Sequence, residues 1–395
     1  MNKERMKELD VLRVIGFIFV VAQHILGGYS WRSGAAFSDS LVLSFLYVIA
    51  KPAVPIFIAV TAMSLCHAYL ERINVIKFYQ NRFLYIFLPY VSWTIINIYD
   101  TQYYDHQGSF DHFFGQLLAG TGRYHLWYMS LILQIYLLFP LILWIAGKII
   151  KKGKVFQAGF LVVFSALYVI LLTNNEVMDA IARFVFVNPT INQLRFFEVS
   201  PLLWSIYLVI GIYMFAGNKK FKELLQRFHK QLFVVYLLLL AYMYYAEIGS
   251  HLPVHYDIES KYINCTIYVS FMVVSIFVFY HLGCYISSQM PRLYFLLSKT
   301  AGNTYTAYLA HVIVLQSVAE EITKTYELKS FLESGLSVFF LTVAFSLIMA
   351  EFFSLLPFSQ VIFGTKNKYY PRFDQIIRRF GVYERQSHGK GKSSM

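Results

Sequence analysis

The stretch LDVLRVIGFIFVVAQHILGGYS, residues 9–30, decides the fold of this chain, because it is apolar over a length that can cross a bilayer. Beyond its first turn two ionisable side chains interrupt it, Arg13 and His24. They are eleven residues apart, which places both on one face of a helix, about 16 Å from each other along its axis. Ionisable groups inside a bilayer are unfavourable and usually functional, so this face is the first candidate for a site.

The composition extends this interpretation to the whole chain. Of 395 residues, 57% are hydrophobic and 14% are charged, whereas soluble domains carry about 25% charged residues. Apolar runs recur throughout, so we predict an all-α, polytopic membrane protein with about ten transmembrane helices. The expected spans are 10–30, 40–70, 83–100, 125–147, 155–173, 200–217, 231–248, 262–286, 301–318 and 331–356. The second run is overlong, so we expect it to tilt, to break at Pro52 or Pro55, or to extend out of the bilayer.

The net charge of +12 is explained by membrane topology rather than by nucleic-acid binding. Alternate connections and the C-terminal tail hold 25 of the 34 Lys and Arg residues, and the other connections hold seven. This distribution predicts that both termini are cytoplasmic. The basic residues are dispersed over several loops, so no nucleic-acid surface is expected. We predict a membrane domain over 1–358 and a basic tail over 359–395 that contacts lipid headgroups.

Arg13 and His24 each have a structural and a functional interpretation. Arg13 is near the inner boundary, where it can extend to lipid headgroups or hold an anionic or carbonyl group. His24 can be a buried histidine bonded to a neighbouring helix, or a general base on the outer side. Because the two share one face, we favour the functional interpretation for the pair.

Four other ionisable side chains are candidates for the same site. Lys51 is deep in the second span and requires a partner or a water-filled cavity. Glu351, the acid of the last span, can pair with Arg13 or Arg82 or line a donor site. His311 is either a packing residue or part of the site, and Arg82 alone is an ordinary residue of an inner loop.

The segment His125-Leu126-Trp127-Tyr128 opens the fourth span at the outer interface. An aromatic belt explains Trp127 and Tyr128 as well as a role in a site does. The three cysteines are scattered in apolar runs, and no metal-ligand spacing, nucleotide-binding loop or serine-elbow motif is present. The sequence therefore predicts neither a metal site nor a disulfide framework.

Taken together, these motifs resemble the acyltransferase 3 family of membrane acyltransferases. The resemblance rests on Arg13 and His24, Val54-Pro55-Ile56-Phe57 with Thr61-Ala62, Arg82 with Pro89-Tyr90, His125-Leu126-Trp127-Tyr128, Gly302 with Tyr305, Tyr308 and His311, and Glu351 with Pro357-Phe358. It covers residues 9–358. The pair Thr61-Ala62 departs from the usual Ser-Gly, which suggests altered packing of the second span.

The resemblance implies an O-acyltransferase of the bacterial cytoplasmic membrane. It would move an acetyl or succinyl group from cytoplasmic acyl-CoA to a hydroxyl of an exported or cell-surface polysaccharide or glycolipid, with no permanently bound cofactor. The layout is most similar to members that acylate exopolysaccharides such as poly-N-acetylglucosamine, and a glycan synthase complex is a further expected partner.

The residue roles implied are as follows. His24 acts as the base, Arg13 and Arg82 face the phosphates of the donor, and Tyr305, Tyr308 or His311 donate to the oxyanion. Glu351 orients Arg13. The main alternative is a polysaccharide exporter or flippase without acyl transfer. Such transporters often contain inverted repeats, which this sequence lacks, and we therefore favour the enzyme.

Overall fold

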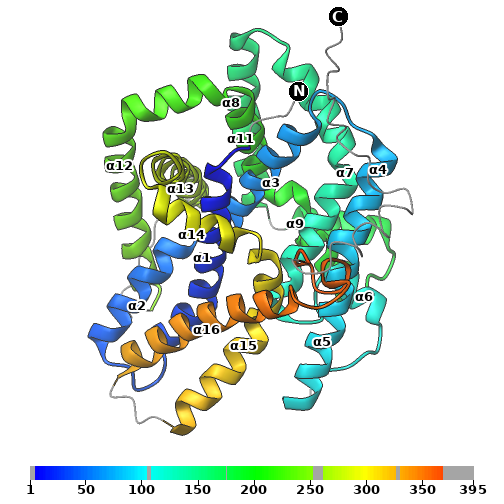
Figure 1. The fold of residues 1–395 in the computed structure, drawn as a ribbon. Coiled ribbons are helices and arrows are strands. Elements are labelled where there is room, and N and C mark those ends of the chain that lie inside the picture. The colour runs from blue at the N-terminus through cyan, green and yellow to red at the C-terminus, as the bar shows by residue number, and fades with distance from the viewer. Residues whose placement is uncertain (1–4, 105–107, 175, 252–260, 326–329, 368–395) are drawn as a thin grey trace, which may run out of the picture.

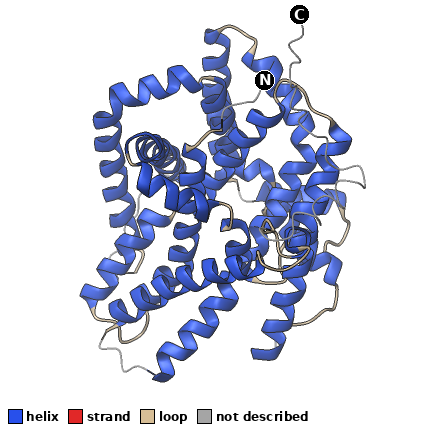
Figure 2. Cartoon of the chain, in the orientation of Figure 1, coloured by secondary structure: helices blue, strands red, loops and turns tan. Residues whose placement is uncertain are grey.

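The computed structural model describes residues 5–104, 108–174, 176–251, 261–325 and 330–367, and in these ranges the chain is helical with no strand (Figure 2). The elements are α1 (Glu8–Ser30), α2 (Phe37–Ala50), α3 (Ala53–Tyr69), α4 (Val75–Arg82), the π-helical turn η1 (Phe83–Phe87), α5 (Leu88–Tyr104), α6 (Phe113–Ala119), η2 (Tyr124–Leu126), α7 (Trp127–Ile150), α8 (Lys154–Thr173), α9 (Glu176–Val185), α10 (Ile191–Glu198), η3 (Pro201–Trp204), α11 (Ser205–Ala216), α12 (Asn218–Gly249), α13 (Lys261–Gln289), α14 (Pro291–Ala301), α15 (Thr304–Thr325), α16 (Phe331–Phe353) and α17 (Ser359–Ile362).

The prediction of an all-α polytopic membrane protein is confirmed. Eight helical segments of the described chain are long and apolar enough to cross a bilayer. Two of the ten expected spans are outside this set. The first is α5, which is short, and the second is α15, whose last turns carry Glu320, Glu321 and Lys324. Both helices nevertheless form where the sequence predicts them, and they pack against each other.

The overlong second run is broken at Lys51–Pro52, between α2 and α3. Proline lacks an N–H group and its ring crowds the preceding turn, so a helix ends readily at this point. Pro55 is only two residues into α3, where its missing N–H group removes no bond within that helix. The break divides one predicted span into two short helices that meet beside α1.

Helix α1 passes through the interior of the molecule (Figure 1) and packs against α2, α3, α13, α14, α15 and α16. Close approach to α3 depends on Gly16, where an added Cβ atom would be 3.1 Å from the ring of Phe57. On its other side α3 approaches α11 at Gly211, where a Cβ atom would be 2.6 Å from the carbonyl oxygen of Ala59. Small residues let helices approach closely in lipid, and here they fix α3 between α1 and α11.

Residues 359–367, which the sequence analysis assigns to the basic tail, pack against the membrane helices. Trp93 Nε1 donates to the carbonyl oxygen of Phe363 at 3.1 Å, and the Phe363 ring stacks on Phe353 with centroids 4.1 Å apart. Thr365 is fully buried. The domain therefore extends to at least Asn367, and the predicted tail from 368 is outside the described residues.

Candidate active site

At the inner end of α1, the Arg13 guanidinium is held by two partners. Nη1 donates to Asp10 Oδ1 at 2.9 Å, and Nη2 donates to Ser64 Oγ of α3 at 2.8 Å. Asp10 is buried and also accepts from Arg5 and from the Tyr294 hydroxyl. The Arg13 side chain remains 34% exposed, so its position is fixed while part of it stays accessible to a ligand. Asp10 is one turn before Arg13 in the sequence, so this spacing could have identified it as the partner of Arg13.

At the outer end of α1, His24 belongs to a cluster of three histidines. Its ring stacks on His311 of α15, with centroids 5.3 Å apart, and meets the Tyr124 ring edge-on at 5.0 Å. His125 of η2 contacts His311 with centroids 4.9 Å apart. The structure thus joins three histidines that the sequence places in three separate segments.

The hydrogen bonds of the cluster determine its proton positions. His311 Nδ1 is 2.5 Å from the Tyr308 carbonyl oxygen, and His125 Nε2 is 3.3 Å from that of Leu309. A carbonyl oxygen only accepts, so these nitrogens carry protons, and in the neutral imidazole the other ring nitrogens carry lone pairs. His125 Nδ1 and His311 Nε2 are both buried and have no partner among the described residues. The cluster therefore offers two unused acceptors beside His24.

The neighbouring tyrosine hydroxyls are already used by the backbone. Tyr308 donates to the His125 carbonyl oxygen at 2.5 Å, and Tyr305 donates to that of Ile86 at 2.8 Å. The N–H group of His311 is also committed, as described above. A buried hydroxyl or ring N–H group is normally satisfied within the protein. Tyr305 thus joins α15 to η1 and Tyr308 joins α15 to η2, and all three donors are committed to backbone carbonyl oxygens.

Trp127 and Tyr128 of the His125-Leu126-Trp127-Tyr128 segment point to different parts of the protein. Tyr128 lies within the site, since its ring contacts Phe57 at 5.8 Å and Tyr308 at 5.7 Å between centroids. Trp127 instead packs on Trp204 at 5.3 Å. The structure thus places Tyr128, rather than Trp127, next to the histidine cluster.

A single accessible stripe on α3 connects the inner and outer parts of the site. From residue 51 to residue 66, only five residues are partly exposed and every other residue is buried. They are Lys51, Val54, Phe57, Thr61 and Ser64. Ser64 binds Arg13, Phe57 touches Gly16 and Tyr128, and Thr61 is hydrogen-bonded to Tyr128. Phe57, Thr61 and Ser64 therefore face α1 and α7 inside the protein rather than lipid.

Arg82 lies at the inner side, where two aromatic rings pack against its guanidinium group. Its guanidinium is 5.1 Å from the centroid of Phe78 and 4.9 Å from that of Tyr136. Tyr136 is also close enough to interact electrostatically with Arg13. The π-helical turn η1 follows Arg82, because Pro89 has no N–H group to continue the regular ladder. Tyr136 thus interacts with both guanidinium groups, through ring contact with that of Arg82 and electrostatically with that of Arg13.

The sequence suggests that Glu351 pairs with Arg13 or Arg82 in its structural role, and its described hydrogen bond is to Asn303, just before α15. Its Oε2 atom accepts from Asn303 Nδ2 at 2.7 Å, and Asn303 Oδ1 accepts from Thr365 at 3.1 Å. Arg13 pairs with Asp10 instead. Glu351 therefore joins α16, the start of α15 and the segment that follows α17.

Lys51 has the partner that its depth requires. Its Nζ atom is 2.6 Å from Glu247 Oε2 of α12, and both side chains are mostly buried, with 18% and 14% exposed. A lysine in a low-dielectric environment is stable when a carboxylate pairs with it. Glu247 could not be assigned from the sequence, because nothing local links it to Lys51.

We expect Glu247→Ala to destabilise the protein by about 3–5 kcal/mol, because it leaves a buried, unpaired ammonium group. The double variant Lys51→Met, Glu247→Met is expected to recover most of this loss. Unfolding in detergent measures both changes. The control is Asp179→Ala, which breaks an exposed pair with Arg183 and is expected to change stability by less than about 1 kcal/mol. Equal losses in the Glu247 and Asp179 variants would contradict the prediction.

The comparisons with known proteins agree with this structure. The family model described as an acyltransferase domain, that of the acyltransferase 3 family, matches residues 6–351, from the residues before α1 to Glu351 of α16. Neither a curated protein nor a solved structure matches the chain. On this match, and with its set of membrane-crossing helices, the chain belongs to the acyltransferase 3 family and is an integral-membrane acyltransferase.

Proposed function

We propose that the protein transfers an acyl group, acetyl or succinyl, from cytoplasmic acyl-CoA to a hydroxyl of an exported or cell-surface polysaccharide. The observation that carries this proposal is the arrangement along α1. An accessible guanidinium lies at the inner end, an accessible imidazole lies at the outer end, and the partly exposed stripe of α3 runs between them.

The inner end suits the nucleotide part of the donor. Arg13 is oriented by Asp10 and Ser64, and the Arg82 guanidinium lies over the ring of Tyr136. Guanidinium groups match the geometry of phosphates. The separation of about 16 Å along α1 is comparable to an extended pantetheine arm, so the thioester reaches the outer half while the nucleotide stays inside.

The outer end suits proton transfer. His24 removes the proton of the acceptor hydroxyl as its oxygen attacks the thioester carbonyl carbon. The new C–O bond forms, the C–S bond breaks, and the thiolate of CoA takes the proton from His24. His125 and His311 are buried, so His24 is the member of the cluster whose partly exposed side chain the acceptor hydroxyl can reach.

The direct test is product formation by the purified protein in nanodiscs. We expect radiolabel from acetyl-CoA or succinyl-CoA to appear as a base-labile ester on the exopolysaccharide of the host, with release of free CoA. Mass spectrometry of the glycan identifies the acyl group and the sugar. Movement of glycan across the bilayer without labelling would instead support an exporter. The bacterial cytoplasmic membrane and a glycan synthase partner remain predictions.

A further inference from the structure

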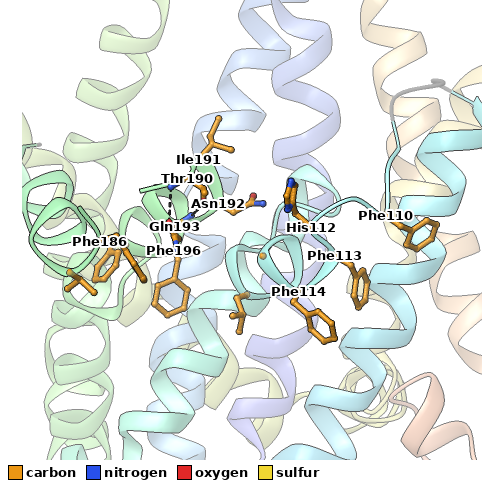
Figure 3. Close-up of a pocket in the computed structure, with 14 residues that line it drawn as sticks. Phe110, His112, Phe113, Phe114, Phe186, Thr190, Ile191, Asn192, Gln193 and Phe196 are labelled. Carbon is orange, nitrogen blue, oxygen red and sulfur yellow. Dashed lines mark hydrogen bonds between the residues drawn. The ribbon is translucent and has the colours of Figure 1, made fainter. Parts of the chain in front are cut away.

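An apolar cavity of ≈ 1010 Å³ lies between α6 on one side and α9 and α10 on the other (Figure 3). It is at the upper end of the range of small-molecule sites, about 300–1,000 Å³. Its walls contain six phenylalanines, Phe110, Phe113, Phe114, Phe186, Phe196 and Phe197. No Asp, Glu, Lys or Arg is among the described residues that line it. The functional site described above does not use this cavity.

Most polar side chains of the cavity already have hydrogen-bond partners within the protein. Thr190 and Gln193 bond each other's backbone as the capping box of α10, shown by the dashed lines in Figure 3. Asn192 accepts from the Thr121 hydroxyl at 2.8 Å. His112 is exposed at the rim. A sugar ring would find few free hydrogen-bonding groups here, whereas a hydrocarbon chain needs none.

The opening of the cavity is apolar as well. Phe114 is 78% exposed, Ile191 82% and Leu118 56%. A hydrocarbon chain can therefore enter from the lipid without passing a polar rim. These helices lie in the connections that the charge distribution places on the outer side, so the opening meets the outer leaflet. Acyl-CoA, which approaches from the inner side, is therefore not its occupant.

Both walls are attached to the helix that begins at the histidine cluster. Ser130 Oγ of α7 donates to the Leu118 carbonyl oxygen of α6 at 2.5 Å, and Gln134 Nε2, one turn later, donates to that of Phe196 of α10 at 3.1 Å. The chain leaves α6 through Gly120, whose φ of 71° and contact with the Trp127 backbone exclude a side chain. It then enters Tyr124-His125 of η2. Cavity and cluster are thus parts of one packed unit.

We propose that this cavity binds the hydrocarbon chain of a lipid-linked glycan in the outer leaflet, with the sugar directed to His24. The proposal rests on the acyl-transfer function proposed above and names the acceptor as membrane-anchored rather than free. Anchoring raises the effective concentration of the sugar at the cluster, because the second contact becomes intramolecular.

The test uses hexadecyl β-D-glucoside with a photoreactive diazirine in its chain, added to the full-length protein in phosphatidylcholine nanodiscs. We expect crosslinks to concentrate in residues 110–118 and 185–197. Unlabelled hexadecyl glucoside should displace the probe, whereas methyl glucoside, which has the same sugar and no chain, should not. Phe114→Asp is expected to reduce labelling by about tenfold or more, since a carboxylate cannot be buried against a chain without a partner.

Phe184→Asp is the matched control, because Phe184 is 92% exposed on α9 and does not line the cavity. Its labelling should equal that of the wild type. Three results would each overturn the proposal. They are even labelling of all lipid-facing helices, full displacement of the probe by added phospholipid, and unchanged labelling of Phe114→Asp. Crosslinking does not require turnover. It therefore tests binding of the hydrocarbon chain in the cavity separately from the acyl-transfer activity. Where turnover is present, Phe114→Asp should raise KM for the alkyl glucoside and leave KM for acyl-CoA unchanged.

Discussion

Replacing His24 by alanine is expected to lower kcat for acyl transfer by about 10²–10⁴-fold, the range that a general base contributes. The side chain is only partly buried and makes ring contacts with His311 and Tyr124, with no hydrogen bond to another described residue. Its loss should therefore leave the fold and KM for acyl-CoA nearly unchanged. Initial rates with radiolabelled donor, at saturating acceptor, measure the effect.

Two further measurements make this prediction specific. Free imidazole should restore part of the activity of His24→Ala, and the restored rate should follow the fraction of imidazole that is unprotonated. His229→Ala is the control, because His229 is exposed on α12 and bonds only to the Gln226 carbonyl among the described residues. Activity of His24→Ala within a factor of three of the wild type would exclude His24 as the base.

The second large effect is expected for Arg13→Ala, with KM for acyl-CoA raised by about 10- to 100-fold and kcat less affected. A hydrogen bond to a charged group contributes about 1.5–3 kcal/mol, which corresponds to this factor. Arg13→Lys should recover only part of the loss. One ammonium group cannot reproduce the planar fork that spans Asp10 and Ser64 and still present a free edge to a phosphate.

A truncated donor identifies what Arg13 binds. If the guanidinium contacts the phosphates, wild type and Arg13→Ala should use acetyl-pantetheine, which lacks the nucleotide, with similar KM. A defect of equal size with both donors would assign Arg13 to the thioester instead. Arg5→Ala is the control, because Arg5 also pairs with Asp10 but its side chain is 67% exposed. Without Arg5, the Asp10 carboxylate keeps its bonds to Arg13 and Tyr294, so KM for acyl-CoA should stay close to that of the wild type.

Much of the fold follows from patterns within single segments. The runs 10–30, 155–173 and 262–286 became α1, α8 and α13 with boundaries shifted by a few residues. The proline break of the second run was among the expected possibilities because Pro52 is read directly from the sequence. The π-helical turn before Pro89 was not predicted, although Pro89, like Pro52, lacks the N–H group that a regular helix requires.

The site was predictable only in part. Arg13 and His24 were found because one helix carries both, and Lys51 was expected to need a partner because of its depth. The roles suggested for Tyr305 and Tyr308 did not anticipate that the Ile86 and His125 carbonyl oxygens take their hydroxyls. Such bonds join segments far apart in the chain, and neither residue type nor spacing reveals them.

By itself, the sequence determined that the chain is a bundle of membrane helices and that Arg13 and His24 lie on one face of α1. Hydropathy and the period of 3.6 residues act within one segment, so a single segment reveals them. Only the tertiary structure decided that His125 and His311 meet His24, that Glu247 neutralises Lys51, and that six phenylalanines enclose a cavity. Inside a bilayer the rotation of each helix is set by detailed packing and hydrogen bonding with its neighbours rather than by hydrophobicity, and no local pattern records it.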